Sequence, residues 1–244
     1  MKAVILAGGR GTRGRPFTDY IPKAMIPVQG KPLIAHIVEY LSSFKIIDDI
    51  IILADFDGLG KQIEKYFENY KRAKKPLRFI QDSQSGTGGD LVHLDKILEK
   101  NSEFLLWFVD NLTPLDIKNM YQFHREKNTL ATIATRKYRK EETGYAIVEN
   151  GVVVEFREKP TIKLEMAECL GIYILNSKIL KIIKSKKAKR KEMNLSYDIL
   201  QPLSKEGKIS AYDIGKNPWI DVDSPGRVER EKELTNTIIK KLQC

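Results

Sequence analysis

The sequence predicts an α/β protein with a doubly wound, mostly parallel sheet of the Rossmann-like type. Short apolar runs alternate with segments of helical periodicity over roughly the first 135 residues, which is typical of such sheets. A glycine-rich segment directly follows the first apolar run, at the position where these sheets bind ligands. The chain has 244 residues, which fits a single domain able to bury a large core.

The expected strands are short apolar runs, and the expected helices lie between them. We expect strands at residues 2–7, 49–54, 77–80, 103–109, 130–135, 169–175 and 209–212. We expect helices at residues 31–44, 58–71, from 85–89 to about 100, 114–127, 176–184, 195–204 and 224–241. In the first helix the apolar residues recur at helical spacing. Asn150-Gly151 between residues 145–148 and 152–156 predicts a β-hairpin.

The net charge and the cysteine content of the chain limit the kinds of partner and the compartment that we expect. The formal net charge of +10 favours anionic ligands such as phosphates and nucleotides. Much of the excess lies in Lys184-Ser-Lys-Lys-Ala-Lys-Arg-Lys191, which we expect to be an exposed loop, since no aromatic residues for base stacking accompany it. Nucleic acid is therefore not expected as a partner. A membrane is not expected either, because no stretch is long and apolar enough to span one. Only Cys169 and Cys244 are present, which excludes a disulfide framework and fits a reducing cytoplasm.

The segment Gly9-x-Gly11-x-x-Gly14 matches the dinucleotide-binding fingerprint letter by letter. That fingerprint requires a helix to open within the motif and an acidic residue about 20 positions later. Pro16 and Pro22 interrupt any such helix, and the second strand ends only near Asp55. The Walker pattern of P-loop proteins is absent. A nicotinamide, flavin or P-loop site is therefore disfavoured.

The same loop has the composition of a triphosphate site. Its glycines allow backbone N–H groups to approach phosphate oxygens, and Arg10, Arg13, Arg15 and Lys23 add positive charge. The alternative is a mobile, solvated loop.

Three segments together resemble the signature of the sugar-1-phosphate nucleotidylyltransferases: Gly8-Gly9-Arg10-Gly11-Thr12-Arg13-Gly14-Arg15-Pro16-Phe17-Thr18, Pro22-Lys23-Ala24-Met25-Ile26-Pro27-Val28 and Lys31-Pro32-Leu33-Ile34. The resemblance covers nearly the whole chain. It implies the family's nucleotide-diphospho-sugar transferase fold and a catalytic role for Arg13 and Lys23 on the triphosphate. It also implies nucleotide contacts from Leu6, Ala7, Gly8, Gly9, Gly11 and Thr12. Ser85-Gly86-Thr87-Gly88-Gly89-Asp90 resembles the family segment near the base, so Gly86 and Thr87 are expected to pack on the base and Gln81 to read its edge.

The resemblance also implies a metal site. Asp110 ends the apolar strand 103–109, where the family places a metal-binding aspartate, although Val109 replaces the usual preceding glycine. Trp219-Ile-Asp221-Val-Asp223-Ser-Pro225 is similar to a second family motif, in which Asp221 matches the other ligand. The implied cofactor is Mg²⁺, which prefers carboxylate and phosphate oxygens. Asp223 replaces a family glycine and is either a further ligand or a support for a helix N-cap at Ser224.

For the sugar phosphate, the matching elements lie in the second part of the chain. Gly144-Tyr-Ala and Arg157-Glu158-Lys159-Pro160 resemble family elements, which makes Glu158 a partner of sugar hydroxyls and Lys159 a catalytic cation on the sugar phosphate. Gly171-Ile-Tyr resembles a further sugar-binding strand, but Cys169-Leu170 stand where an asparagine is expected.

We therefore expect one nucleotidyltransferase domain over residues 1–244, with residues 1–143 mainly binding nucleotide and 144–244 forming a small sugar-phosphate extension. No C-terminal hexapeptide-repeat domain is expected. The expected reaction joins a nucleoside triphosphate to a glucose- or mannose-type sugar 1-phosphate by displacement at the α-phosphorus. The alternatives are a cytidylyltransferase acting on another phosphomonoester such as phosphocholine, and a regulatory subunit that binds nucleotide-sugars. The base (UTP, dTTP or GTP), the sugar and the oligomeric state, a homo-oligomer included, stay open.

Overall fold

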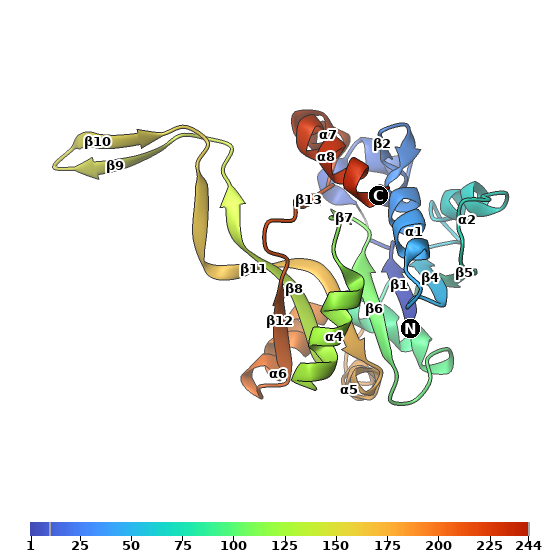
Figure 1. Cartoon of the computed structure of the whole chain (residues 1–244). Helices are drawn as coiled ribbons and strands as arrows, with labels where there is room; N and C mark the ends of the chain where they lie inside the picture. The colour runs from blue at the N-terminus through green and yellow to red at the C-terminus, as the bar shows by residue number, and fades with distance from the viewer. Residues whose placement is uncertain (10, 244) are drawn as a thin grey trace.

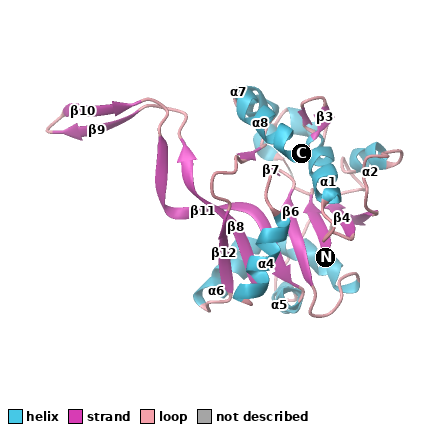
Figure 2. Ribbon diagram, viewed as in Figure 1, coloured by secondary structure: helices cyan, strands magenta, loops and turns pink. Residues whose placement is uncertain are grey.

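The computed structural model describes residues 1–9 and 11–243, and its centre is a seven-stranded sheet (Figures 1 and 2). The strand order is β12-β8-β11-β6-β1-β4-β5. All neighbours pair in parallel except β11, which runs antiparallel to both β6 and β8. The doubly wound, mostly parallel sheet is confirmed. Arg10, which we expected to contribute to the phosphate loop, and Cys244 lie outside the described residues.

The sheet strands are β1 (Lys2–Leu6), β4 (Asp49–Ala54), β5 (Leu77–Gln81), β6 (Glu103–Phe108), β8 (Ala131–Lys140), β11 (Thr161–Asn176) and β12 (Ile209–Asp213). Shorter strands are β2 (Pro27–Val28), β3 (Lys31–Pro32), β7 (Asn111–Leu112), β9 (Tyr145–Glu149), β10 (Val152–Arg157) and β13 (Ile220–Asp221). The α-helices are α1 (Leu33–Ser43), α2 (Lys61–Phe67), α3 (Gly86–Gly89), α4 (Ile117–Lys127), α5 (Lys178–Lys187), α6 (Gln201–Lys205), α7 (Pro225–Arg230) and α8 (Lys232–Leu242). A π-helix spans Leu195–Leu200, and 3-10 turns span Thr12–Gly14, Phe17–Asp19, Lys23–Met25 and Asp90–Lys96.

Two apolar cores lie on opposite faces of the sheet, because successive side chains of a strand point to opposite faces. Ala3 and Ile5 of β1 belong to the core beneath α1, α2, α4 and α8. Val4 and Leu6 belong to the core beneath the 3-10 turn Asp90–Lys96, α5, the π-helix and α6. Burial on both faces explains why the sheet strands read as continuous apolar runs.

The carboxyl ends of β1, β4, β5 and β6 meet at one edge of the sheet. The parallel register pairs Leu6 with Leu53 and Phe108, and Leu53 with Ile80. The strands therefore deliver the glycine loop, Asp55, Asp82 and Asp110 to the same edge. Ligands of open α/β sheets bind at this edge.

Some expected elements differ from the structure. The helix expected at 114–127 begins only at Ile117, because the Asp116 side chain accepts a hydrogen bond from Asn119 N and caps the helix there. Residues 86–96 form a four-residue helix and a 3-10 turn rather than one helix, and residues 225–242 form two helices. The basic tract is not one exposed loop, since its first four residues form the last turn of α5. Within the described residues, no helix combines the length and apolarity needed to cross a bilayer.

The hairpin signal at Asn150-Gly151 is confirmed, but its placement was not foreseen. Strands β9 and β10 form a separate ribbon that projects away from the body (Figure 1). Its large apolar side chains are 42% to 64% exposed: Tyr145, Ile147, Val148, Val152, Val153, Val154 and Phe156. We call residues 145–157 the arm.

Candidate active site

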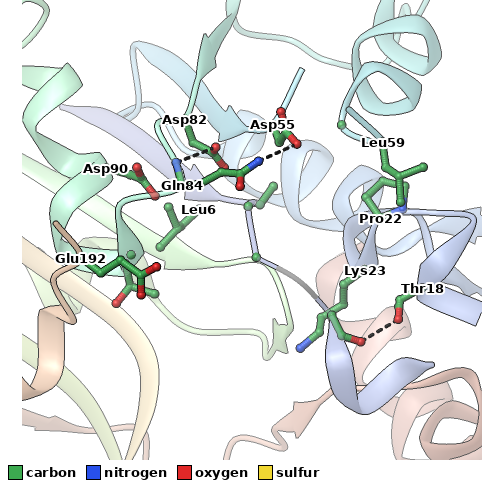
Figure 3. Close-up of a pocket in the computed structure, with 17 residues that line it drawn as sticks. Leu6, Thr18, Pro22, Lys23, Asp55, Leu59, Asp82, Gln84, Asp90 and Glu192 are labelled. Atoms are coloured by element: carbon green, nitrogen blue, oxygen red, sulfur yellow. Dashed lines mark hydrogen bonds between the residues drawn. The ribbon is translucent and has the colours of Figure 1, made fainter. Parts of the chain in front are cut away.

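A cavity of about 500 Å³ lies at the carboxyl edge of the sheet (Figure 3). Its floor is formed by the end of β1 and the glycine loop, and its walls come from the segments that follow β4 and β5. The lining residues are Leu6, Ala7, Gly8, Gly9, Gly11, Thr18, Pro22, Lys23, Asp55, Leu59, Gly60, Asp82, Gln84, Gly86, Thr87, Asp90 and Glu192. Acidic side chains gather at one end of the cavity, while Lys23 and Thr18 lie at the other (Figure 3).

At the acidic end, Asp90 holds a tight loop between β5 and α3. Oδ1 of Asp90 accepts hydrogen bonds from the backbone N–H groups and the hydroxyls of Ser83 and Ser85, all at 2.9 to 3.1 Å. Lys187, from α5, donates to both hydroxyls and to the carbonyl of Gly89. One lysine of the basic tract therefore fixes the wall of the cavity.

Asp82 lies next to this loop and faces the glycine-rich floor. Its carboxyl has a pKa raised to about 6, chiefly by burial and then by the nearby Asp90 carboxylate. A Cβ added at Gly8 would lie 2.3 Å from Asp82 Oδ2, so only glycine leaves room between the floor and this carboxylate.

At the opposite end, the glycine loop folds into consecutive 3-10 turns and places two cations. Gly11 adopts a left-handed conformation (φ 57°), and its carbonyl accepts a 2.6 Å hydrogen bond from the Thr18 hydroxyl. The turn at Lys23 follows Pro22 and directs the ammonium group to Asp110 Oδ2 at 3.0 Å. Arg13 reaches Asp221 Oδ2 at 3.2 Å and Asp223 at 3.6 Å.

Asp110 and Asp221 come from opposite halves of the chain and meet because β7 pairs with β13. Asp221 lies opposite Asn111 in this pairing, and Val222 N donates to the carbonyl of Asp110 at 2.7 Å. The pKa of Asp221 is raised, first by burial and then by the Asp110 carboxylate, against the lowering effect of Arg13 and Lys23. Two carboxylates thus share one partly buried site with two cations.

These two carboxylates fit a divalent cation that also binds phosphate oxygens. Oδ1 of Asp221 is buried and has no hydrogen-bond partner among the described residues, which is unfavourable without a further ligand. Within the same residues, no group of three or more His, Cys, Asp or Glu side chains could hold a metal by itself. Mg²⁺ commonly uses one or two carboxylates and takes its other ligands from phosphates and water.

Most of the expected nucleotide contacts line the cavity: Leu6, Ala7, Gly8, Gly9, Gly11, Gly86 and Thr87. Thr12 and Gln81 do not. Thr12 lies in the 3-10 turn beside Arg13. The Gln81 side chain accepts hydrogen bonds from Phe56 N and Asp57 N and donates to Asp55 Oδ1, so it shapes the loop behind the cavity.

The expected sugar-phosphate residues fall into two places. Gly171 has a left-handed backbone (φ 66°) at a bulge of β11, and a Cβ there would lie 2.5 Å from Asn111 Nδ2, next to Asp110. Gly144, Glu158 and Lys159 lie together at the base of the arm, where a Cβ on Gly144 would lie 2.9 Å from Glu158 Oε2. Among the described residues, no hydrogen bond or ion pair joins Glu158 or Lys159 to Asp110 or Asp221.

The structure adds site residues that the sequence reasoning missed. Asn111 donates to Asp110 Oδ1 at 2.8 Å and accepts from Trp219 Nε1 at 3.0 Å, which orients the carboxylate. Asp55 and Gln84 line the cavity and bond to each other. Asp82 directly follows Gln81, and Asn111 directly follows Asp110. Their position next to expected site residues was the signal that could have identified them. Ser224 caps α7 and donates to Asp223 Oδ1, which agrees with the cap alternative for Asp223.

A family model and several curated relatives match most of this chain. A family model described as nucleotidyl transferase matches residues 2–230. A UTP–glucose-1-phosphate uridylyltransferase of Synechocystis is 32% identical over 91% of this chain, and a mannose-1-phosphate guanyltransferase of Aspergillus oryzae is 29% identical over 92%. The chain spans about three fifths of the length of these relatives.

Solved structures share the fold. A Bacillus anthracis chain provisionally described as a glucose-1-phosphate thymidylyltransferase, in complex with sucrose, superposes with a TM-score of 0.76 at 24% identity over 98% of this chain and 96% of its own. A UDP-glucose pyrophosphorylase complexed with UDP-glucose gives 0.69 at 23% identity, with 98% of both chains covered. At these identities the likeness establishes the fold alone.

Proposed function

Because this chain belongs to the nucleotidyl transferase family, we propose that it joins a nucleoside triphosphate to a sugar 1-phosphate and releases pyrophosphate. The observation that carries the proposal is the cluster of Asp110, Asp221, Arg13 and Lys23, the last of which also lines the cavity. The names of its relatives, a glucose-1-phosphate uridylyltransferase and a mannose-1-phosphate guanyltransferase, support glucose- or mannose-type substrates.

The residues divide the reaction between two ends of the cavity. The base and ribose occupy the part between the glycine floor and Gly86-Thr87, which places the triphosphate over Gly11, Thr18 and Lys23. An oxygen of the sugar phosphate attacks the α-phosphorus in line as pyrophosphate leaves. That oxygen is already anionic near neutral pH, so the attack requires no protein base. The main barrier is repulsion between two anions, which positioned cations reduce.

Lys23 and Arg13 are the proposed cations on the triphosphate. Both now pair with carboxylates of the site, Lys23 with Asp110 and Arg13 with Asp221. Asp110 and Asp221 would hold Mg²⁺, which supplies charge neutralisation and phosphate orientation when bound. With Mg²⁺ on the two carboxylates, Lys23 and Arg13 would become available to bind phosphate oxygens.

The sugar phosphate belongs between the base of the arm and the Asp221 segment. Glu142 at the base of the arm pairs with Arg227 of α7 at 2.7 Å, and α7 begins four residues after Asp221. This ion pair supports the proposal that Glu158 and Lys159 face the sugar phosphate, with Gly171 on the other side beside Asn111.

Association with a second copy is a further expectation, because the arm exposes apolar side chains on an unpaired two-stranded ribbon, and such ribbons are marginal in water alone. Residues 145–157 carry Glu149, Glu155 and Arg157, so arm-to-arm contact meets little charge repulsion despite the chain's +10. Sedimentation of the parent and of Val153→Lys tests this: a dimer that dissociates in the variant supports it, and a monomeric parent contradicts it. A reducing cytoplasm remains the expected compartment.

The reaction is tested by pyrophosphate release with Mg²⁺, using each common nucleoside triphosphate against glucose, mannose and N-acetylglucosamine 1-phosphates. Release should require one sugar phosphate and should be lost in Asp110→Ala. Release only with a non-sugar acceptor such as phosphocholine would favour the other acceptor class. Nucleotide-sugar binding without release from any pair would favour a regulatory role.

A further inference from the structure

At the acidic end of the cavity, Asp82 is a buried carboxylate that the protein satisfies only in part. Asp55 receives Gln81 Nε2 on one oxygen and Gln84 Nε2 on the other, at 3.0 and 3.1 Å. Asp90 is bonded to the loop through its Oδ1, which accepts from Ser83 and Ser85. Glu192, which also lines the cavity, is an exposed residue. Asp82 accepts only the Gln84 N–H, at 3.2 Å on Oδ1, and among the described residues nothing donates to its Oδ2.

The Asp82 side chain is only 6% exposed, and it borders the floor of the cavity. Its Oδ2 faces the Cα of Gly8, and both residues line the cavity. Figure 3 shows Asp82 beside Gln84 and above Leu6, at the end away from Lys23. A nucleotide whose phosphates lie near Lys23 therefore brings its base to Asp82.

We propose that Asp82 selects guanine, so that the nucleoside triphosphate used by this chain is GTP. This inference rests on the proposed function and names the base of its substrate. An ionised carboxylate only accepts hydrogen bonds, and each of its oxygens has capacity for more than one. It therefore matches a base edge that presents two neighbouring donors.

Guanine is the common base with such an edge, because its N1–H and its 2-amino group lie side by side. Uracil and thymine offer a single N–H between two carbonyl oxygens, which would face the carboxylate unfavourably. In adenine and cytosine the amino group stands next to a ring nitrogen that is an acceptor. Two nearby donors suited to such acceptors are already used: the Gln84 amide is bonded to Asp55, and the Lys187 ammonium is bonded to the loop.

The experiment compares GTP with ITP, which keeps N1–H and lacks the 2-amino group, and with UTP, dTTP, CTP and ATP. Pyrophosphate release should give kcat/KM for GTP at least about 100-fold above UTP and dTTP, since sites built to pair with a polar group reject substrates lacking it. ITP should fall about 10- to 100-fold below GTP, the value of one hydrogen bond to a charged group.

Asp82→Asn assigns the selection to this residue. The GTP-to-ITP ratio should fall at least fivefold in the variant and should persist in the matched control Asp95→Asn, whose surface carboxylate pairs with Lys184 away from the cavity. Equal losses for all nucleotides in Asp82→Asn would mean a structural role and would overturn the proposal, as would a parent enzyme that prefers UTP or dTTP.

Calorimetric titration with GDP, IDP and UDP separates this inference from the proposed reaction, because it requires no turnover. Preferential GDP binding that depends on Asp82, without pyrophosphate release, would support guanine selection and reject the reaction. Pyrophosphate release with UTP as the preferred nucleotide would support the reaction and reject guanine selection.

Discussion

Asp221→Asn separates catalysis from stability, because Asp221 is unfavourable to the fold and, as we propose, needed for the reaction. The aspartate is 30% exposed, its Oδ1 has no partner within the described residues, and Asp110 repels its charge. The substitution relieves burial of that charge and loses the ion pair to Arg13. That pair is worth only about 0 to 1 kcal/mol, since Arg13 is 61% exposed.

The two stability effects oppose each other, so we expect unfolding free energy within about 1 kcal/mol of the parent. For a chain of this size that is a change in Tm of roughly 2 to 4 °C, upward if relief of the buried charge dominates. Catalysis should behave differently. Losing one group that positions charge at the reacting phosphate costs about 100- to 1000-fold in turnover.

The assays are pyrophosphate release and thermal melting with and without Mg²⁺ and nucleotide. Saturating Mg²⁺ and nucleotide should raise the Tm of the parent, since ligand at 100 times its Kd adds about 2.7 kcal/mol, and should raise it less in Asp221→Asn. A variant with more than a tenth of the parental activity and the same Mg²⁺-dependent rise in Tm would refute the metal-binding role. Asp213→Asn, on the exposed end of β12, controls for the loss of a surface carboxylate.

Three further predictions concern the nucleotide cavity. Gly8→Ala should weaken nucleotide binding at least about tenfold by calorimetry, because its Cβ would lie 2.3 Å from Asp82 Oδ2. Gly226→Ala in α7 should not, because its Cβ would lie 3.6 Å from Arg230 Nη1. Lys187→Met should raise the KM for the nucleotide roughly 5- to 20-fold by loosening the loop 83–89. Lys184→Met, one turn earlier and paired with Asp95 on the surface, should leave the KM unchanged, and equal effects of the two substitutions would reject the positioning role of Lys187. Because the pKa of Asp82 is raised to about 6, its charge destabilises the fold above that pH, and this destabilisation is relieved as the pH falls through 6. Asp82→Asn should therefore raise Tm more at pH 8 than at pH 5. Equal gains in Tm at both pH values would contradict burial of the Asp82 charge as the cause.

Much of the sheet could be read from the sequence, because buried parallel strands leave continuous apolar runs. Residues 49–54 and 103–108 are nearly all buried and were expected with almost the observed bounds. Helix boundaries were less accurate where local capping decided them, as at Asp116, and where the chain changed helix type, as after Gly89. The extension of β8 and β11 toward the arm carries no continuous apolar signal, since its residues are mostly exposed.

The residues of the candidate site likewise fall into those that could be identified from the sequence and those that could not. Arg13, Lys23 and the glycine floor follow one another along the chain, and Asp110 and Asp221 each stand in a motif that resembles a family signature. Asp82, Asn111 and Lys187 carry no comparable motif, because their roles depend on contacts made across the fold.

The sequence by itself determined the fold class, since buried strands leave apolar runs at short spacing. It also predicted a phosphate site in the glycine loop from its residue types, and two metal-binding candidates through the resemblance of their motifs to a family signature. Tertiary structure alone decided which of these residues meet. Asp110 and Asp221 are far apart in the chain and come together only because β7 pairs with β13. Folding likewise brings donors to both oxygens of Asp55, whereas among the described residues Asp82 receives a donor on Oδ1 alone. Pairing between distant segments leaves no periodic mark in a single sequence, and it is this pairing that sets the charge of the site.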